Sequence, residues 1–159
     1  MQMLLEAGAD ARETTPFGWT ALHSSVGSSS TNDWFAGPEG RRRVRSAFDC
    51  ATALLAAGAD PNAMANSWTT PLMIVGCAGL RESPLATRLY AVLLRGGARL
   101  ESDDQGSSPY LDKVHDAGDW KRYAHAHRTR LVATFAPKLL LPADVIPLVV
   151  DFWANVGMY

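Results

Sequence analysis

Leu54-Leu55-Ala56-Ala57-Gly58-Ala59-Asp60 is one of three copies of the same pattern in this chain of 159 residues. The other two copies are Leu4-Leu5-Glu6-Ala7-Gly8-Ala9-Asp10 and Leu93-Leu94-Arg95-Gly96-Gly97-Ala98-Arg99. Internal repetition at a spacing of tens of residues is typical of proteins in which each unit buries its apolar face against the next unit. The repetition therefore predicts stacked units before any single helix is assigned.

A second shared pattern follows each copy and predicts the start of a helix. Its versions are Gly18-Trp19-Thr20-Ala21-Leu22-His23, Trp68-Thr69-Thr70-Pro71-Leu72-Met73 and Gly106-Ser107-Ser108-Pro109-Tyr110-Leu111. A hydroxyl at such a position can accept a hydrogen bond from an unpaired helix N–H group, and proline is favoured at the first helical position. We therefore expect N-caps at Thr20, Thr70 and Ser108. Gly8, Gly58 and Gly97 are expected to end the preceding helices in a left-handed conformation.

Together, these helix starts and helix ends resemble the ankyrin repeat. The resemblance covers about residues 2–118, as about three degenerate units of which the first is incomplete. The family period is about 33 residues, whereas the glycines here stand 50 and 39 residues apart. The excess indicates insertions between the two helices of a unit, around Ser28–Arg45 and Gly79–Ala86. Trp68 stands where the family has its turn glycine.

The resemblance implies an all-α fold, an ankyrin-type α-solenoid of helix–turn–helix units with a C-terminal helical cap. We expect two regions, residues 1–118 with the repeats and residues 119–159 with a helical extension. Helices are expected at about 2–7, 20–28, 44–57, 70–79, 85–96, 109–117 and 119–135. The leucines expected to be buried between units are Leu22, Leu54, Leu55, Leu72, Leu93 and Leu94.

The family implies protein–protein recognition, with no catalytic and no cofactor-binding residues to carry over. Its binding surface is formed by the tips of the units and the inner helices. The residues that we expect to contact a partner are Phe17, Trp19, Asn66, Trp68, Asp103 and Asp104. Exposed aromatic side chains are frequent anchors of protein interfaces. The alternative is local packing, with Trp19 against Trp68 on neighbouring tips.

Composition gives no case for other classes of function. The net charge of −1 provides no electrostatic attraction for nucleic acid or an anionic membrane. No apolar run approaches the ~18 residues of a membrane span. Cys50 and Cys77 are expected to be reduced thiols in buried helices, which suits an intracellular protein of the cytoplasm or nucleus.

The histidines do not indicate chemistry. His23 occupies the motif histidine position, where we expect it to bond to the turn and to the Thr20 region. His125 and His127 are two residues apart on an expected helix and so point to different faces, and with His115 they do not complete a zinc pattern. We therefore expect neither a metal site nor an enzyme.

A basic run, Arg41-Arg42-Arg43-Val44-Arg45, follows the first insertion. It is either a patch that binds phosphate groups or an import receptor, or the solvated start of a helix. Four cations near a helix N-terminus oppose the helix dipole, which favours a loop or a bound partner for these arginines.

The tail contains Leu141-Pro142-Ala143-Asp144-Val145-Ile146, followed by Val149, Val150 and Trp153. This stretch is similar to the opening of an F-box, and with Leu139 and Leu140 it is similar to the closing segment of a SOCS box. Either resemblance implies a substrate adaptor that recruits a ubiquitin ligase through residues 141–153. The alternative is a terminal helix that caps the solenoid, which repeat proteins need for solubility. A further alternative is that the chain is a fragment of a larger multidomain protein.

The spacing of apolar residues in the tail predicts one helical face. That face consists of Val145, Leu148, Val149, Phe152 and Trp153. Because Pro147 is tolerated only in the first turn of a helix, we expect the helix to begin near Asp144 or later. We expect its apolar face to fold back onto the last repeat and onto the helix that contains Trp120, Tyr123, Leu131 and Phe135.

Overall fold

The computed structural model describes residues 2–27, 38–77, 84–101, 108–137, 142 and 144–156. Over these ranges the chain is mostly helical and contains no strand, so the expected all-α class is confirmed. The chain divides into two compact units, Met1–Leu111 and Asp112–Tyr159. No helix within the described ranges is long and apolar enough to cross a membrane.

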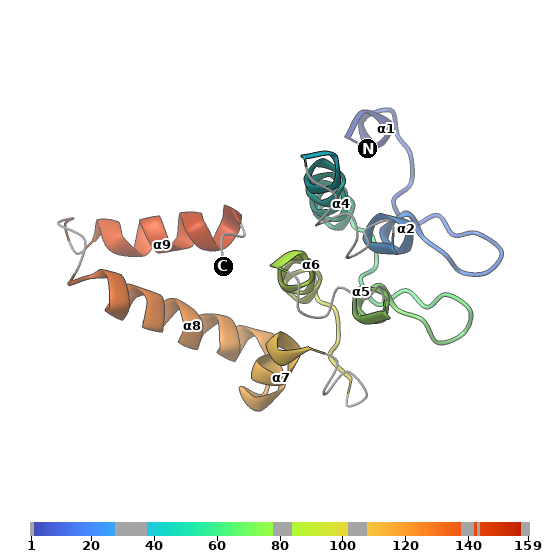
Figure 1. Cartoon of the computed structure of the whole chain (residues 1–159). Coiled ribbons are helices and arrows are strands. Elements are labelled where there is room, and N and C mark those ends of the chain that lie inside the picture. The colour runs from blue at the N-terminus through green and yellow to red at the C-terminus, as the bar shows by residue number, and fades with distance from the viewer. Residues whose placement is uncertain are drawn as a thin grey trace. The chain divides into compact units, whose positions relative to one another are not determined.

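The first unit contains α1 (Gln2–Glu6), α2 (Ala21–Gly27), α4 (Pro38–Ala56), α5 (Pro71–Cys77) and α6 (Pro84–Arg95). Two short helices, α2 and α5, lie side by side, and the longer α4 and α6 form a second layer beside them (Figure 1). Each short helix also contacts the following long helix. The helix that bridges the division between the two units is α7 (Pro109–Asp116).

Leucines from both layers form the core of the first unit. Those that are almost completely buried are Leu22, Leu54, Leu72, Leu89 and Leu93, with Leu94 close behind at 5% exposed. Burial of the expected leucines is therefore confirmed, except that Leu55 is half-buried. Leu55 packs where the next long helix ends, because a Cβ added to Gly96 would lie 2.9 Å from its Cδ2 atom.

The two long helices of the first unit end in the same way. At the end of α4, Gly58 has a φ of 87° and the Ala59 N–H donates to the Leu54 carbonyl at 2.9 Å. At the end of α6, Gly97 has a φ of 98° and the Ala98 N–H donates to the Leu93 carbonyl at 2.9 Å. This is the Schellman closure, which requires a left-handed residue after the helix. The expected roles of these glycines are confirmed.

The helix starts also repeat. The hydroxyls of Thr20, Thr70 and Ser108 each accept a hydrogen bond from a backbone N–H in the following turn, at 3.3 Å in every case. Pro71 and Pro109 are the first residues of their helices. The three expected N-caps are therefore confirmed.

Equivalent side chains connect successive copies of the pattern. Arg12 donates from Nε to the carbonyl of Gly58 at 2.9 Å, and Asn62 donates from Nδ2 to the carbonyl of Gly97 at 3.0 Å. Arg12 and Asn62 stand four residues after Gly8 and Gly58, so each bond joins the same two positions in neighbouring copies. The same hydrogen bond therefore joins each of these copies to the next one.

The long helix α4 begins earlier than expected, at Pro38 instead of about residue 44. Of the alternatives for Arg41, Arg42, Arg43 and Arg45, the loop is excluded, because these residues lie in the first turns of the helix. A bound partner for them stays a prediction. Proline is favoured at a first helical position. Cys50, further along α4, is half-buried and forms no disulfide. Residues 28–37 and the side chain of Cys77 lie outside the described part.

The second unit pairs α8 (Trp120–Phe135) with α9 (Val145–Val156). Asp119 caps α8, since its Oδ1 atom accepts from the Arg122 N–H at 2.8 Å. The helix α9 begins directly after Asp144 and places Pro147 in its first turn, as expected. The expected packing of the tail on the helix of residues 119–135 is also confirmed. Its packing on the last repeat stays a prediction.

The buried face of α9 differs from the expected one. Ile146 and Val150 are 4% and 1% exposed, whereas Leu148 is 66% exposed. The expectation that Leu148 lies on the buried face was wrong. Every residue from Val145 to Val150 is apolar, so the spacing alone cannot distinguish a face that starts at residue 145 from one that starts at 146. The side chains of Phe152 and Trp153 lie outside the described part.

Candidate partner-binding site

Two short loops project side by side from the first unit, ahead of α2 and α5 (Figure 1). We call residues 14–20 the first tip and residues 64–70 the second tip. Each is a narrow hairpin closed by an isolated antiparallel bridge, Thr14 with Thr20 and Ala65 with Thr69. The Thr15 N–H donates to the Trp19 carbonyl at 2.9 Å, and the Ala65 N–H donates to the Thr69 carbonyl at 2.8 Å. The two tips are thus closed by equivalent bonds.

The turns at the ends of the two tips differ in backbone conformation. In the first tip, Gly18 takes the left-handed position with a φ of 77°. In the second tip, Trp68 stands at the equivalent position, and the positive φ angles move to Asn66 (51°) and Ser67 (71°). A bulky side chain is disfavoured in the left-handed region, whereas asparagine tolerates it better than most residues. The second tip therefore keeps its hairpin with a tryptophan in place of glycine.

The two tips are held against each other. The Asn66 N–H donates to the Phe17 carbonyl at 2.9 Å. A Cβ added to Gly18 would lie 2.5 Å from the carbonyl oxygen of Met64, so only glycine fits at this contact. Because the tips are joined through their backbones, the side chains that they carry are presented from a fixed base.

His23 fixes the base of both tips from the first turn of α2. Its Nδ1 atom lies 3.1 Å from the Thr20 backbone N and 2.8 Å from the Thr20 hydroxyl, and its Nε2 atom lies 3.2 Å from the Thr69 carbonyl. A backbone N–H can only donate, so Nδ1 is the acceptor and Nε2 carries the proton that is donated to Thr69. The expected structural role of His23 is confirmed, and it extends to the second tip.

Burial controls the charge state of His23. The imidazole is completely buried, and this desolvation lowers its pKa, partly opposed by hydrogen bonds to the backbone of Thr69 and Ala63. The same group also supports the first tip through its ring. The Trp19 ring packs on the His23 ring with centroids 5.4 Å apart.

The residues expected to contact a partner fall into three groups. Phe17 and Trp68 are 71% and 64% exposed, and the Asn66 side chain is also exposed. Trp19 is half-buried against His23 and supports the tip from inside. Asp103 and Asp104 lie outside the described residues.

Met64 is a member of this surface that we did not single out from the sequence. It is 59% exposed and lies on the second tip. Its place within the tip was predictable, but sequence reasoning favoured aromatic residues over methionine. Phe17, Met64 and Trp68 together form what we call the apolar triad, three exposed apolar side chains on two tips that are joined by a hydrogen bond.

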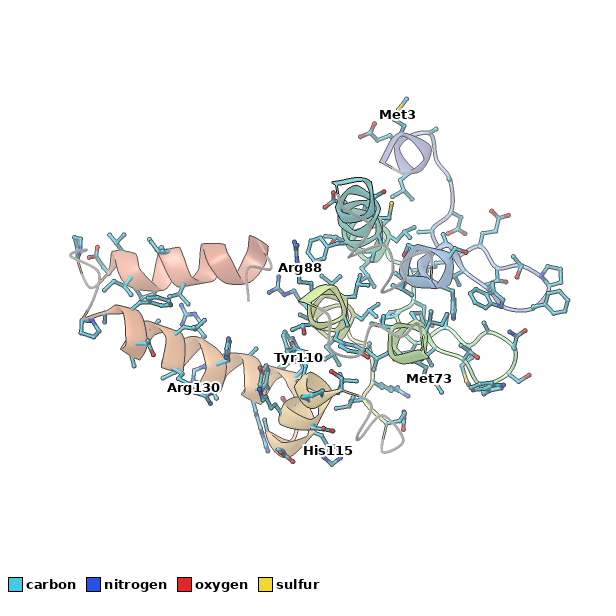
Figure 2. All side chains as sticks on the ribbon, viewed as in Figure 1. Met3, Met73, Arg88, Tyr110, His115 and Arg130 are labelled. Carbon is cyan, nitrogen blue, oxygen red and sulfur yellow. The ribbon has the colours of Figure 1, made fainter. Side chains whose placement is uncertain are left out.

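The three histidines of the second unit are far from the tips in sequence and differ in their surroundings. His115 and His125 are exposed, and His127 is half-buried with its ring stacked on Tyr123 at 5.7 Å between centroids. Burial lowers the pKa of His127, and the nearby charges of Arg130 and Lys113 lower it further. Among the described residues, no three metal-binding side chains gather into a group. Figure 2 shows that Arg130 projects from the side of α8 opposite α9.

No protein-family model matches the chain, and no curated protein matches its sequence.

Proposed function

We propose that the first unit is an ankyrin-type solenoid that binds another protein through its two tips. The fold proposal is supported by the repeated glycine closures, the repeated N-caps and the repeated bond from Arg12 or Asn62 to the next glycine carbonyl. In this proposal the protein is an intracellular interaction scaffold of the cytoplasm or nucleus and is not an enzyme.

The observation that carries the proposed function is the apolar triad on its fixed base. Interfaces concentrate their binding energy in a few aromatic and other large side chains that become fully desolvated. Phe17 and Trp68 are exposed and are the kind of residue that does this. Because the backbone bond between the tips orders them before binding, little conformational entropy remains to be lost on association.

Site-specific photo-crosslinking in cells tests the proposed function. A benzophenone amino acid is placed at Phe17 or Trp68, with Met3 as the control position because it is 82% exposed on α1. We expect one protein to crosslink from both tip positions and not from position 3. Crosslinks that are identical at all three positions, or none at the tips, would contradict the proposal.

Purified partner then gives the energetic test. The double variant Phe17→Ala and Trp68→Ala should weaken binding by about 2–4 kcal/mol, the range of interface hot spots. Circular dichroism checks that the variant keeps its helices. Unchanged affinity would move the binding site away from the tips.

The exposed Leu148 on α9 favours one alternative function. An apolar side chain that is 66% exposed on the tail helix could contact a further protein. In this alternative, residues 141–153 recruit a ubiquitin ligase and the repeats bind its substrate. Deletion of residues 137–159 distinguishes this adaptor function from a structural role of the tail as a cap. Loss of a captured ligase subunit with unchanged stability supports the adaptor, and a lower melting temperature with aggregation supports the cap.

A further inference from the structure

The chain segments that lead to the two tips contain exposed carboxylates. Two segments of the sequence, residues 6–20 and residues 58–70, contain four acidic residues and one basic residue. The acidic residues are Glu6, Asp10, Glu13 and Asp60, and the basic residue is Arg12. All four acidic side chains are exposed. Asp10 and Asp60 occupy the same position in their copies of the pattern, at the start of the turn that leads to each tip. These two segments therefore carry an excess of negative charge.

Backbone hydrogen bonds hold two of these carboxylates, those of Asp10 and Asp60. An Oδ1 atom of Asp10 accepts from the Arg12 N–H at 2.8 Å, and an Oδ1 atom of Asp60 accepts from the Asn62 N–H at 2.9 Å. Arg12 directs its Nε–H to the Gly58 carbonyl instead of to a carboxylate. These two carboxylates are thus held in place, while Arg12 forms a contact between copies.

The second tip also contains strained backbone. Asn66 and Ser67 hold φ angles of 51° and 71°, and both directly precede Trp68. Consecutive non-glycine residues in the left-handed region cost free energy, and such strain is concentrated at functional sites. A glycine in place of Trp68, as at Gly18 of the first tip, would remove this cost but also the exposed indole.

We infer that the partner of the tips presents a basic peptide segment with an apolar anchor, so that cationic side chains face Asp10, Glu13 and Asp60 while the anchor covers the apolar triad. This inference rests on the proposed function and adds the chemistry of the partner to it. Opposite charges at an interface rim raise the association rate and select partners.

A random 12-residue phage library tests the inference. The library is selected on the full chain, after depletion on the double variant Phe17→Ser and Trp68→Ser, so that only peptides that need the tips remain. We expect the selected peptides to share an aromatic or aliphatic anchor and to carry a net positive charge. Selected peptides that are neutral or acidic would overturn the inference and leave the proposed function in place. A selection without tip-dependent peptides would count against both.

Isosteric variants supply the matched control. In Asp10→Asn and Asp60→Asn the side-chain oxygen that accepts the backbone N–H is kept and the charge is removed, so the local turns are preserved. Combined with Glu13→Gln, these changes should weaken a selected peptide roughly tenfold at low salt, with a smaller effect at high salt. Asp49→Asn, an equal change of charge on an exposed position of α4, should have no effect. Equal affinity for the triple variant and the unchanged chain would also overturn the inference.

Discussion

At the scale of single residues, His23 connects two copies of the pattern that are far apart in sequence. Its neutral ring accepts from Thr20 and donates to Thr69, which ties the cap of α2 to the second tip. Protonation of Nδ1 would remove the acceptor and place a charge in a completely buried position. The contribution of this residue to stability therefore depends on pH.

The sign of this dependence follows from the lowered pKa of His23. Above the ordinary value of 6.5 the ring is neutral in both the folded and unfolded chain, and its contribution is fully present. As the pH falls below 6.5, the unfolded chain binds the proton first, so the folded state loses stability until the folded-state pKa is passed. Urea unfolding between neutral and mildly acidic pH should show this loss.

His23→Asn provides the comparison for that experiment, since asparagine does not titrate. His127 also has a lowered pKa and contributes with the same sign, so the unfolding curve of the whole chain contains both effects. The difference between the unchanged chain and the variant isolates His23. Parallel curves for the two proteins would contradict its assignment as a buried neutral donor.

The two tip turns predict opposite effects of small residues. Ser67→Gly should stabilise the fold by about 0.5–1 kcal/mol, because glycine takes a positive φ without steric cost but loses more entropy on folding. Gly18→Ala should destabilise it by about 1–2 kcal/mol from the left-handed backbone alone. The close approach to Met64 adds to that loss. Thermal unfolding measures the change in stability of each variant. Changes in the same direction for the two variants would show that the φ angles do not determine the energetics of the tips.

At the scale of elements, α9 has a clear inner and outer side although its first turns are uniformly apolar. Ile146 and Val150 are buried one turn apart, and Leu148 faces solvent. Side chains four residues apart lie on one face of a helix, so these residues define the side that α9 buries. Periodicity could not select this side in advance, because neighbouring positions are equally apolar.

Matched substitutions on α9 test that assignment. Ile146→Ala should cost about 2–4 kcal/mol, as expected for a large-to-small change in a core. Leu148→Ala should change stability by no more than about 0.5 kcal/mol, since surface substitutions have small effects. The free energy of unfolding from urea titration gives both values. Similar costs for the two variants would contradict the assignment of Ile146 to the buried side of α9 and of Leu148 to its exposed side.

The sequence predicted most of the helices because their signals are local. Threonine or serine caps, prolines at first helical positions and a glycine after the last turn need no tertiary contact to be recognised. The turn of the second tip was not predictable, since its form depends on how Trp68 displaces the positive φ angles onto Asn66 and Ser67. The exposure of Met64 likewise depends on packing between tips, which a single sequence does not contain.

At the scale of the whole molecule, the first unit is held together by contacts between neighbouring copies. Leu72 illustrates this, since it is 2% exposed on α5 and lies in the layer shared with α2. For the proposed solenoid, stability is approximately a sum of terms for each unit and for each interface between units. A cavity at one interface should therefore destabilise the entire unit of residues 1–111.

Leu72→Ala should lower the free energy of unfolding by about 2–5 kcal/mol. The half-buried neighbour Met73 is a suitable control, because Met73→Ala removes a side chain of similar volume with less burial and should cost less. Chemical denaturation followed by circular dichroism measures both. A cost below about 1 kcal/mol for Leu72→Ala would contradict its place in the core.

The hydrogen bond from His23 to Thr69 also provides a spectroscopic marker. A ring N–H that is completely buried and hydrogen-bonded exchanges slowly with solvent, so the Nε2 proton should give its own downfield resonance in a proton NMR spectrum. Only a closed second tip places the Thr69 carbonyl within 3.2 Å of that nitrogen. The line would therefore broaden or vanish when the tips separate, and one proton would report, without any label, whether the paired tips stay together when a ligand binds.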